Sequence, residues 1–406
     1  MRLVVSTCLL GTACRYDGRA KRCDEVARLS RKVRDAGGTV VGVCPEVAGG
    51  LPVPRPCAEL CGDEVVLANG HRVTEAFERG ARLELDEALA THDLPLAVLK
   101  ARSPSCGVGF VYDGTHTGTL ARGNGVFARL LGERGVHMAT EDSVRACTPS
   151  MEHPVALILG SGMGHLSGLV KPVRRIAYQD IAGFPADARP VEGHSFEATV
   201  GTIDGVPVVV YPGRVHLYQG YGALEVTSLV QHARCLGCRV VVFACATGAI
   251  PGVARKGLSV IADHINLTGA NPLVGWNVTE DSAPLVSTEF VDMAQVYTPY
   301  LRGLVLGVAR DMGIDVKEGV LAGVLGPSFE TPAEVGALKA LGVSHVGMST
   351  VCEAIMAHAL GMQVLGLTLA TNYAGEPGVS HQTVLREAQL HAEEFEGLVR
   401  GVLALL

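Results

Sequence analysis

Five apolar runs in the second half of the chain are each followed directly by a polar loop. The loops carry glycine, hydroxyl, amide, Arg, His and Glu residues and lie at Gly160–Gly164, Pro212–Tyr221, Gly326–Thr331, Val346–Thr350 and Leu369–Tyr373. Open α/β sheets bind ligands outside the carboxyl ends of their strands. The spacing therefore predicts one ligand site that is assembled from these loops.

Two of these loops have residues suited to an oxyanion. The glycines around Ser161 let backbone N–H groups converge on an anion, and the serine hydroxyl adds a donor. In an extended segment, Arg214, His216 and Tyr218 share one face. A plain tight turn and a solvated arginine are the alternatives without a ligand.

Three cysteines of the first half, Cys8, Cys44 and Cys106, each follow an apolar run typical of a strand. The carboxyl ends of parallel strands meet at one edge, so the three thiols can share a pocket. Three thiolates and one open position suit an iron–sulfur cluster with a substrate-accessible iron, or a zinc ion. Buried structural cysteines are the alternative, and we expect that role for Cys14, Cys23, Cys57, Cys61 and Cys147.

Length and composition predict two domains and argue against nucleic-acid-binding and membrane proteins. With 406 residues, 48% of them hydrophobic, two cores are expected. Polar and proline residues at 147–153 predict a boundary between domains 1–147 and 153–406. A net charge of −7 argues against a protein that binds nucleic acid by neutralising phosphates. Without an 18-residue apolar run or a signal sequence, we expect a cytoplasmic protein with no membrane span.

Both halves alternate apolar strands with amphipathic helices, which is typical of α/β domains. In the first half we expect strands at 2–6, 39–43 and 95–99 and helices at 24–36, 74–90 and 125–131. In the second half we expect strands at 155–159, 206–211, 240–244, 258–262, 319–325, 344–347 and 363–368, and helices at 222–236, 296–312, 331–341, 350–360 and 380–406. The predicted fold class is α/β, a Rossmann-like αβα domain followed by an α/β domain with a mixed central sheet.

The loops of the second half, taken together, resemble those of the trimeric purine nucleoside phosphorylase family. The matching motifs, in family order over about residues 153–400, are Gly160–Gly162, Gly213–Tyr221, Asp263–Leu267, Gly326–Thr331, Gly347–Thr350 and Thr371–Asn372. The resemblance implies phosphorolysis of inosine- or guanosine-type nucleosides to free purine and ribose 1-phosphate. It also implies a homotrimer that needs no cofactor.

The resemblance further implies a role for individual residues. The implied phosphate ligands are Ser161, Arg214, His216, the backbone of Ala246, and Ser349. The implied nucleoside contacts are Glu330 and Asn372 on the purine, Phe329 stacked near it, Met348 beneath the ribose, and Tyr218 and His381 at the sugar hydroxyls. His216, Glu330 and Asn372 are the implied catalytic residues. His194 would lie near the phosphate, and Phe290 would reach a neighbouring subunit's ribose.

Glu330 and Asn372 predict the base that is cleaved. A carboxylate can accept N1–H of a 6-oxopurine, which adenine lacks, while an amide donates to N7, so the pair predicts hypoxanthine or guanine. One alternative is an S-methyl-5′-thioadenosine or -thioinosine phosphorylase, against which Asn372 and His381 argue because a methylthio group prefers apolar neighbours. Another alternative is a cluster-bearing nucleoside sensor.

One loop departs from the family pattern. Where the family has Asn-Ala-Ala-Gly-Gly, this sequence has Cys245–Ala249.

The first half resembles a bacterial domain family that includes thiouracil desulfurases. The matching motifs are Ser6–Gly11, Arg15–Gly18, Cys44–Glu46, Gly49–Leu51, Pro54–Pro56, Ser103–Gly107 and Gly123–Val126. The resemblance implies a [4Fe-4S] cluster on Cys8, Cys44 and Cys106, whose fourth iron binds a substrate sulfur. It also makes Glu46 and Ser103 candidates for proton transfer.

Overall fold

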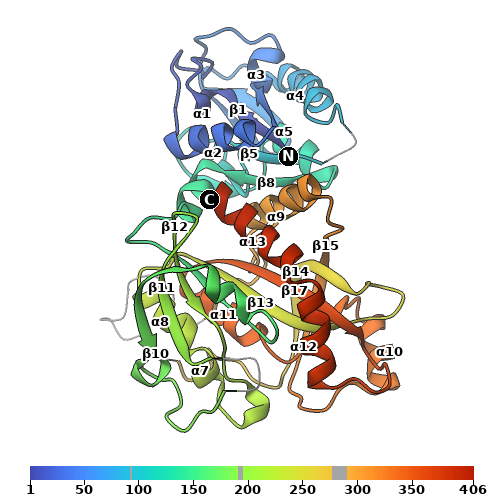
Figure 1. Ribbon diagram of the computed structural model, residues 1–406. Helices are drawn as coiled ribbons and strands as arrows, with labels where there is room; N and C mark the ends of the chain where they lie inside the picture. The colour runs from blue at the N-terminus through green and yellow to red at the C-terminus, as the bar shows by residue number, and fades with distance from the viewer. Residues whose placement is uncertain (92–93, 191–194, 277–289) are drawn as a thin grey trace. The chain divides into compact units, whose positions relative to one another are not determined.

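A computed structural model describes residues 1–91, 94–190, 195–276 and 290–406 of the chain (Figure 1). Contacts between Cα atoms divide it into one unit of Met1–Thr148 with Leu405–Leu406 and a second unit of Pro149–Ala404. Each unit has its own sheet and is described by itself.

The first unit has a four-stranded sheet with helices on both faces. Its elements are β1 (Arg2–Ser6), α1 (Thr7–Leu10), α2 (Asp24–Asp35), β2 (Thr39–Val43), α3 (Pro45–Ala48), β3 (Ala58–Cys61), β4 (Glu64–Leu67), α4 (Thr74–Ala88), β5 (Leu96–Leu99), β6 (Phe110–Tyr112), β7 (Leu120–Arg122), α5 (Val126–Glu133), β8 (His137–Thr140) and α6 (Glu141–Cys147). The strands run parallel in the order β2-β1-β5-β8. The pairs β3–β4 and β6–β7 form two small antiparallel hairpins.

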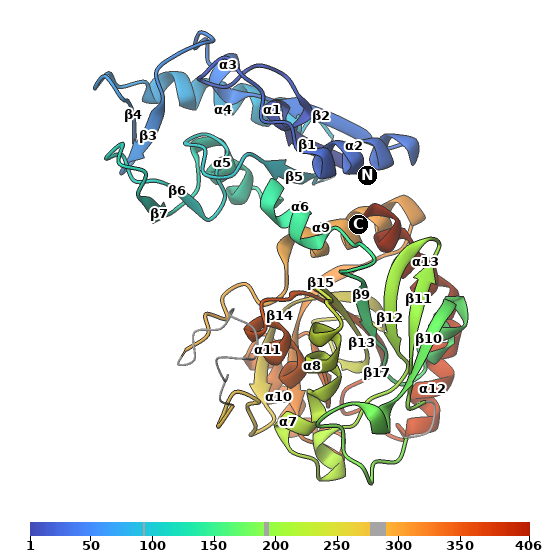
Figure 2. The same ribbon diagram turned by 90° about the vertical axis from the view of Figure 1, so that its left-hand side faces the viewer.

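Alternation along β1 explains why helices cover both faces of this sheet. Successive side chains of a strand point to opposite faces, and Val4 packs in one cluster with Phe77 of α4 and Phe127 of α5. Leu3 and Val5 are also fully buried, on the face that α2 covers. Figure 2 shows the sheet between the two layers of helices. The unit is thus a three-layer αβα domain whose strand carboxyl ends share one edge.

The second unit is built on a larger mixed sheet. Its elements are β9 (Val155–Ile158), β10 (Lys171–Ala177), β11 (Glu197–Ile203), β12 (Val206–Tyr211), α7 (Ala223–Val226), α8 (Ser228–Cys235), β13 (Val240–Ala249), β14 (Gly257–Leu267), α9 (Pro299–Met312), β15 (Lys317–Val324), α10 (Pro332–Ala340), β16 (His345–Gly347), α11 (Val351–Ala359), β17 (Gln363–Tyr373), α12 (His381–Leu390) and α13 (Ala392–Leu405), with 3-10 turns at Gly164–Leu169, Tyr178–Asp180 and Leu217–Gln219. The strand order is β10-β11-β12-β9-β13-β16-β15-β14-β17. An additional pairing of β13 with β17 closes the last five strands into a ring.

Helices cover this ring from two sides. Figures 1 and 2 show α7, α8 and α11 on one side of the sheet and α12 and α13 on the other. The core between α8, α11 and the sheet includes Leu229, Ile355, Phe243 and Tyr297, all nearly or fully buried. The α/β class agrees with the prediction, and the sheet is mixed because β13 pairs antiparallel with β16 and parallel with β17.

Two helices that were predicted to be continuous are each divided into two in the structure. The predicted helix 222–236 is split into α7 and α8 at Thr227, whose hydroxyl donates to the carbonyl oxygens of Ala223 and Leu224 at 3.1 and 3.0 Å. Such back-bonding by threonine bends a helix. The predicted helix 380–406 is likewise two helices, α12 and α13, that meet at His391.

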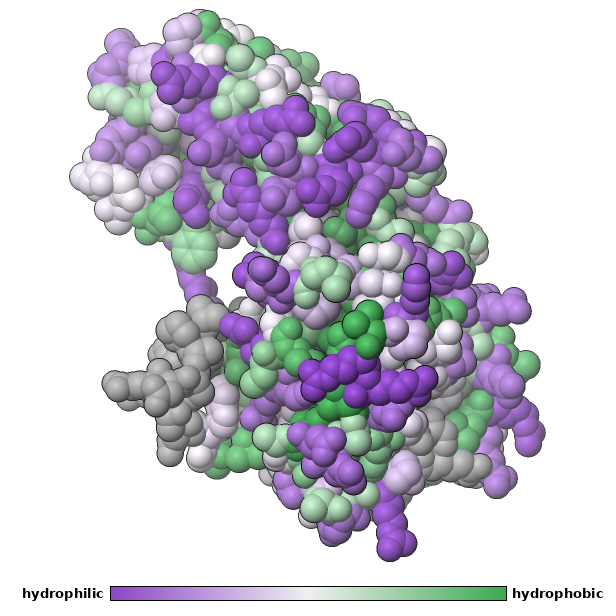
Figure 3. Space-filling view, turned by 60° about the vertical axis from the view of Figure 1, so that its left-hand side comes forward, coloured by the Kyte–Doolittle hydropathy of each residue, from purple (hydrophilic) through white to green (hydrophobic). Residues whose placement is uncertain are grey.

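Hydrophilic side chains dominate the face of the first unit that Figure 3 shows. Among the described residues, no helix combines the length and the apolar character needed to cross a membrane.

Candidate functional site

A cavity of about 320 Å³ in the second unit is lined by residues from all five predicted loops. Eleven residues with a predicted role line it: Ser161, Arg214, His216, Tyr218, Ala246, Phe329, Glu330, Met348, Ser349, Asn372 and His381. Not all the strands that carry them run the same way, because β16 is antiparallel to β13. The loops meet because the sheet closes on itself, rather than at one edge of an open parallel sheet.

Arg214 is the buried cation of this cavity. Its side chain is 1% exposed, and Nη1 donates to Oε2 of Glu353 at 2.9 Å. Nη2 donates to the carbonyl oxygen of Ala244. A Cβ at position 160 would lie 2.9 Å from that Nη2 and 2.8 Å from the Ala244 oxygen, so only glycine fits at Gly160. The glycine loop thus makes room for the guanidinium.

Glu353 also holds the loop that carries Ser349. Its Oε2 accepts from the backbone N–H of Thr350 at 2.8 Å. Thr350 has φ of +75°, which is a strained conformation for a β-branched residue. A buried carboxylate therefore fixes both the guanidinium and the turn next to Ser349. Glu353 was not among the predicted site residues, although Thr350-x-x-Glu353 is a capping-box pattern.

The ring of His216 has a defined tautomer. Gln219 Oε1 accepts from the His216 backbone N–H at 2.8 Å, which identifies that side-chain atom as the oxygen. The same oxygen lies 3.3 Å from His216 Nδ1, so Nδ1 carries a proton. The imidazole stacks on Tyr218 with ring centroids 4.7 Å apart. In the neutral ring Nε2 is therefore the acceptor, and in the charged ring it becomes a donor to an anion.

Glu330 and Asn372, the predicted contacts of the base, line the same cavity. Burial raises the pKa of Glu330, and the neighbouring carboxylate of Glu334 adds to that rise. Asn372 is 7% exposed; its Nδ2 donates to the Tyr373 carbonyl, and its Oδ1 accepts from the Thr371 hydroxyl, each at 3.0 Å. Thr247 stands where the family has alanine. Its hydroxyl forms a hydrogen bond with the hydroxyl of Thr368 at 2.6 Å, so it has a partner within the core.

Two predicted residues are not placed in the cavity. Phe290 does not line it, and its side chain is 92% exposed. His194 lies outside the described residues.

The cap of α10 sets the position of Glu330. The hydroxyl of Thr331 accepts from the backbone N–H of Glu334 at 3.2 Å and caps the helix. Glu330 therefore lies just before the helix.

We expect Glu353→Gln to raise the KM for phosphate about ten-fold, a loss of about 1.4 kcal/mol. The amide keeps an acceptor but removes the charge that orients Arg214, so the KM for nucleoside should change little. Initial rates at varied phosphate and varied inosine separate the two. Glu197→Gln is the control, because Glu197 pairs with Arg175 on the surface at 2.7 Å. Equal phosphate KM in wild type and Glu353→Gln would contradict a positioning role for Glu353.

A second cavity, of about 470 Å³, lies in the first unit at the carboxyl ends of β1, β2 and β5. Cys8, Cys44 and Cys106 all line it, as do Glu46 and Ser103. Burial raises the pKa of the Cys106 thiol to about 12. Cys14, to which sequence analysis gives no role at this site, lines the same cavity. Its distance of six residues from Cys8, in the loop after the same strand, is the signal that could have pointed to it.

Glu46 and Ser103 each have a structural partner in this cavity. Glu46 Oε2 accepts from Arg55 Nε at 2.9 Å and from Arg55 Nη2, so two nitrogens of the guanidinium donate to one carboxylate oxygen. Ser103 Oγ accepts from the backbone N–H of Ser105 and of Cys106, at 3.2 and 3.1 Å. Ser103 therefore shapes the turn on which Cys106 lies. Because its oxygen only accepts in these two bonds, the hydroxyl proton of Ser103 stays available for donation.

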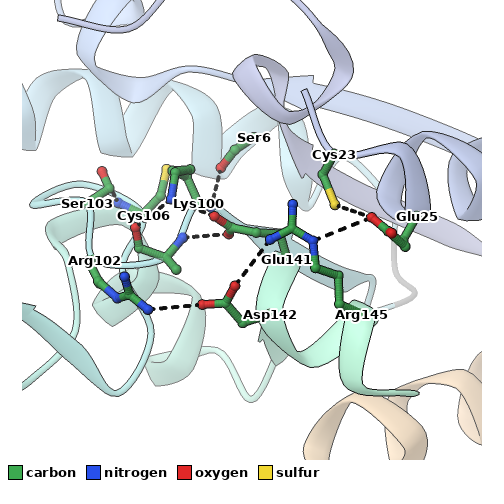
Figure 4. A network of polar contacts seen from close by, with 11 residues as sticks. Ser6, Cys23, Glu25, Lys100, Arg102, Ser103, Cys106, Glu141, Asp142 and Arg145 are labelled. Atoms are coloured by element: carbon green, nitrogen blue, oxygen red, sulfur yellow. Dashed lines mark hydrogen bonds and ion pairs between the residues drawn. The ribbon is translucent and has the colours of Figure 1, made fainter. Parts of the chain in front are cut away.

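A polar network supports the edge of the cavity (Figure 4). Glu141 accepts from Lys100 Nζ at 2.5 Å and from the Ala101 backbone N–H at 2.7 Å. Ser6 Oγ accepts from the Lys100 backbone N–H at 3.0 Å, which ties the ends of β1 and β5 together. These contacts fix the strand ends that precede Cys8 and Cys106.

Among the residues the structure describes, no three His, Cys, Asp or Glu side chains are arranged to hold a single metal ion. An iron–sulfur cluster makes a different demand, because each thiolate binds a different iron at a corner of the cluster. The three predicted thiols line one cavity, as the ligands of such a cluster must.

Comparison with known proteins confirms both resemblances. Residues 3–143 match the family model described as 2-thiouracil desulfurase, and residues 154–404 match that of the phosphorylase superfamily. Purine nucleoside phosphorylase 1 of Bacillus subtilis (strain 168) is 38% identical over 254 residues, which are 62% of this chain and 91% of the relative. The Bos taurus purine nucleoside phosphorylase is 33% identical over 261 residues, 62% of this chain and 88% of the relative. The crystal structure of the Schistosoma mansoni purine nucleoside phosphorylase in complex with adenosine aligns with a TM-score of 0.56 and 32% identity, covering 62% of this chain and 90% of that one.

Proposed function

The chain belongs, over residues 154–404, to the phosphorylase superfamily, and from this membership we propose that it is a purine nucleoside phosphorylase. The reaction converts a 6-oxopurine nucleoside and phosphate to the free purine and ribose 1-phosphate. The observation that carries the proposal is the gathering of eleven predicted ligand residues around one cavity. The test is an assay of inosine, guanosine, adenosine and methylthioadenosine with and without phosphate.

The phosphate end of the cavity would position the nucleophile. Ser161, Arg214, His216, Ser349 and the backbone N–H of Ala246 supply donors around an anion. One phosphate oxygen bonds to C1′ as the bond from C1′ to N9 breaks, and the purine leaves with the electron pair. Because the sugar has oxocarbenium character, holding the phosphate in place supplies much of the rate.

The base end would stabilise the negative charge that develops on the leaving purine. Asn372 donates from its amide to N7, and Glu330 accepts the N1–H of a 6-oxopurine, which supports selectivity against adenine. Tyr218 and His381 lie at the ribose, with Phe329 and Met348 as apolar contacts. His381 lines the cavity as a polar neighbour, which favours a 5′ hydroxyl over a methylthio group.

We expect a homotrimer in which Phe290 completes a neighbour's ribose site, because an apolar side chain 92% exposed fits a residue offered to a partner. Phe290→Ala should raise the KM for inosine about ten-fold and leave the trimer mass intact by light scattering. Val173→Ala, which trims another exposed apolar side chain, is the control. A fully active monomer at assay concentration would contradict the shared site.

For the first unit we propose a [4Fe-4S] cluster on Cys8, Cys44 and Cys106, in support of a desulfurase activity on a thione. The three thiols share a cavity with Glu46 and Ser103 and with the cation Arg55, a donor set that suits a cluster. When bound, the cluster supplies an iron that binds the sulfur of the thione. The net reaction is hydrolysis, in which C=S and water give C=O and hydrogen sulfide without an oxidant. Glu46 as carboxylate can accept a proton from water, and Ser103 can donate one.

A further inference from the structure

We propose that Cys14 is a fourth protein sulfur at the cluster site and holds the substrate-binding corner until a thione displaces it. This inference rests on the cluster proposed for the first unit. It adds a residue that the motif of three cysteines does not contain.

The thiol of Cys14 lies among the other thiols. Cys14 is 8% exposed and lines the same cavity as Cys8, Cys44 and Cys106. Its Sγ is 3.3 Å from Thr7 Oγ1, and the same hydroxyl donates to the carbonyl oxygen of Val43, the residue before Cys44, at 3.1 Å. Four sulfur atoms from three loops therefore surround one space.

The backbone of Cys14 is anchored from across the cavity. Its carbonyl oxygen accepts from Arg55 Nη2 at 3.2 Å, and the Sγ of Cys44 lies 3.8 Å from the same oxygen. Arg55 is itself fixed by Glu46, and its side chain is 4% exposed. With the carbonyl held in place, a change of χ1 rotamer is enough to turn the thiol toward the cavity or away from it.

A structural cysteine of this unit has different surroundings. Cys147 is fully buried, and burial alone raises the pKa of its thiol. Cys14 instead shares its cavity with the three predicted ligand thiols and with the guanidinium of Arg55. Its surroundings are those of a metal-binding sulfur rather than of a packing residue.

The chemistry of the cluster gives this fourth thiol a specific position. Three cysteines occupy three iron corners and leave one open. A thiolate and a thione sulfur are both soft ligands and compete for the same iron. Cys14 would then protect the open corner when substrate is absent, and the thione would have to replace it.

The test compares the full-length wild type with Cys14→Ala and Cys147→Ala, each reconstituted anaerobically and then treated briefly with ferricyanide. We expect wild type and Cys147→Ala to keep about four irons per chain, and Cys14→Ala to keep about three. The Cys14→Ala sample should show the EPR signal of a [3Fe-4S] cluster. If the open form is about a tenth of the wild type, the apparent Kd for 2-thiouracil should fall about ten-fold in Cys14→Ala.

The possible outcomes distinguish the role of Cys14 from the presence of the cluster. A wild-type cluster that loses iron as readily as Cys14→Ala, with unchanged affinity for 2-thiouracil, overturns the role of Cys14 and leaves the cluster in place. A wild-type chain that binds no iron removes both the cluster and the role of Cys14. Loss of all iron from Cys14→Ala also overturns the displaceable contact, because it makes Cys14 a required ligand.

Discussion

Asn372→Asp will lower kcat/KM for inosine about 10²-fold and raise it for adenosine. The change removes the proposed amide donor to N7, and loss of one preorganised donor costs about 10²–10³ in rate. A carboxylate can instead accept from a 6-amino group. Because Asn372 is 7% exposed, solvent cannot replace the lost contact. Steady-state kinetics with both nucleosides, at saturating phosphate, measures the change in preference.

The control for this variant is the same substitution at an exposed site. Asn271 accepts from the Leu273 backbone N–H at 2.9 Å, and Asn271→Asp keeps that acceptor outside the cavity. It should leave both nucleosides unaffected. If the wild type cleaves adenosine as well as inosine, the assignment of Glu330 and Asn372 to the base is wrong.

Cys8→Ala, Cys44→Ala and Cys106→Ala will each remove most of the iron from a chain that otherwise carries about four irons. The proposed cluster needs all three thiolates, and each comes from a different loop of one cavity. Iron and sulfide analysis of anaerobically purified protein measures this. The wild type should be brown and should release sulfide from thio-substituted pyrimidines or purines.

Cys23→Ala and Cys147→Ala are the matched controls, because both thiols are buried and neither lines the cavity. They should keep their iron. Phosphorolysis of inosine should survive in all five variants, since the proposed ligands of that reaction lie beyond residue 153. One zinc per chain in place of iron would contradict the desulfurase proposal.

The short apolar strands were predictable because their hydrophobic runs are bounded by polar loops. The strands β1, β2 and β12 begin and end where the sequence predicts. The ends of β13 and β17 were not predictable, because both strands continue past their apolar runs into polar residues. Asn372 is still part of β17 and pairs with Gly248 of β13. Pairing with a neighbouring strand, rather than local hydrophobicity, decides these ends.

Residues that act by positioning or contacting other side chains were not predicted from the sequence. The alternation of Arg214 and His216 indicated a polar face, but Glu353 pairs with Arg214 across 139 residues of chain. Cys14 does not directly follow a predicted strand, and it was among the cysteines that were expected to be structural. Spacing places each of them near a loop of its site, but their contacts across each site are tertiary and do not follow from spacing. The hairpins β3–β4 and β6–β7 were missed because strands of three or four residues have too few positions for a clear alternation.

Phosphate dependence of inosine cleavage by the purified full-length protein tests the central claim most directly. With phosphate present, we predict hypoxanthine and ribose 1-phosphate in equal amounts, with no purine released when phosphate is omitted. Separation of the products by chromatography measures both compounds in one reaction. Release of hypoxanthine with free ribose in the absence of phosphate, or no cleavage of inosine or guanosine at all, would contradict the account.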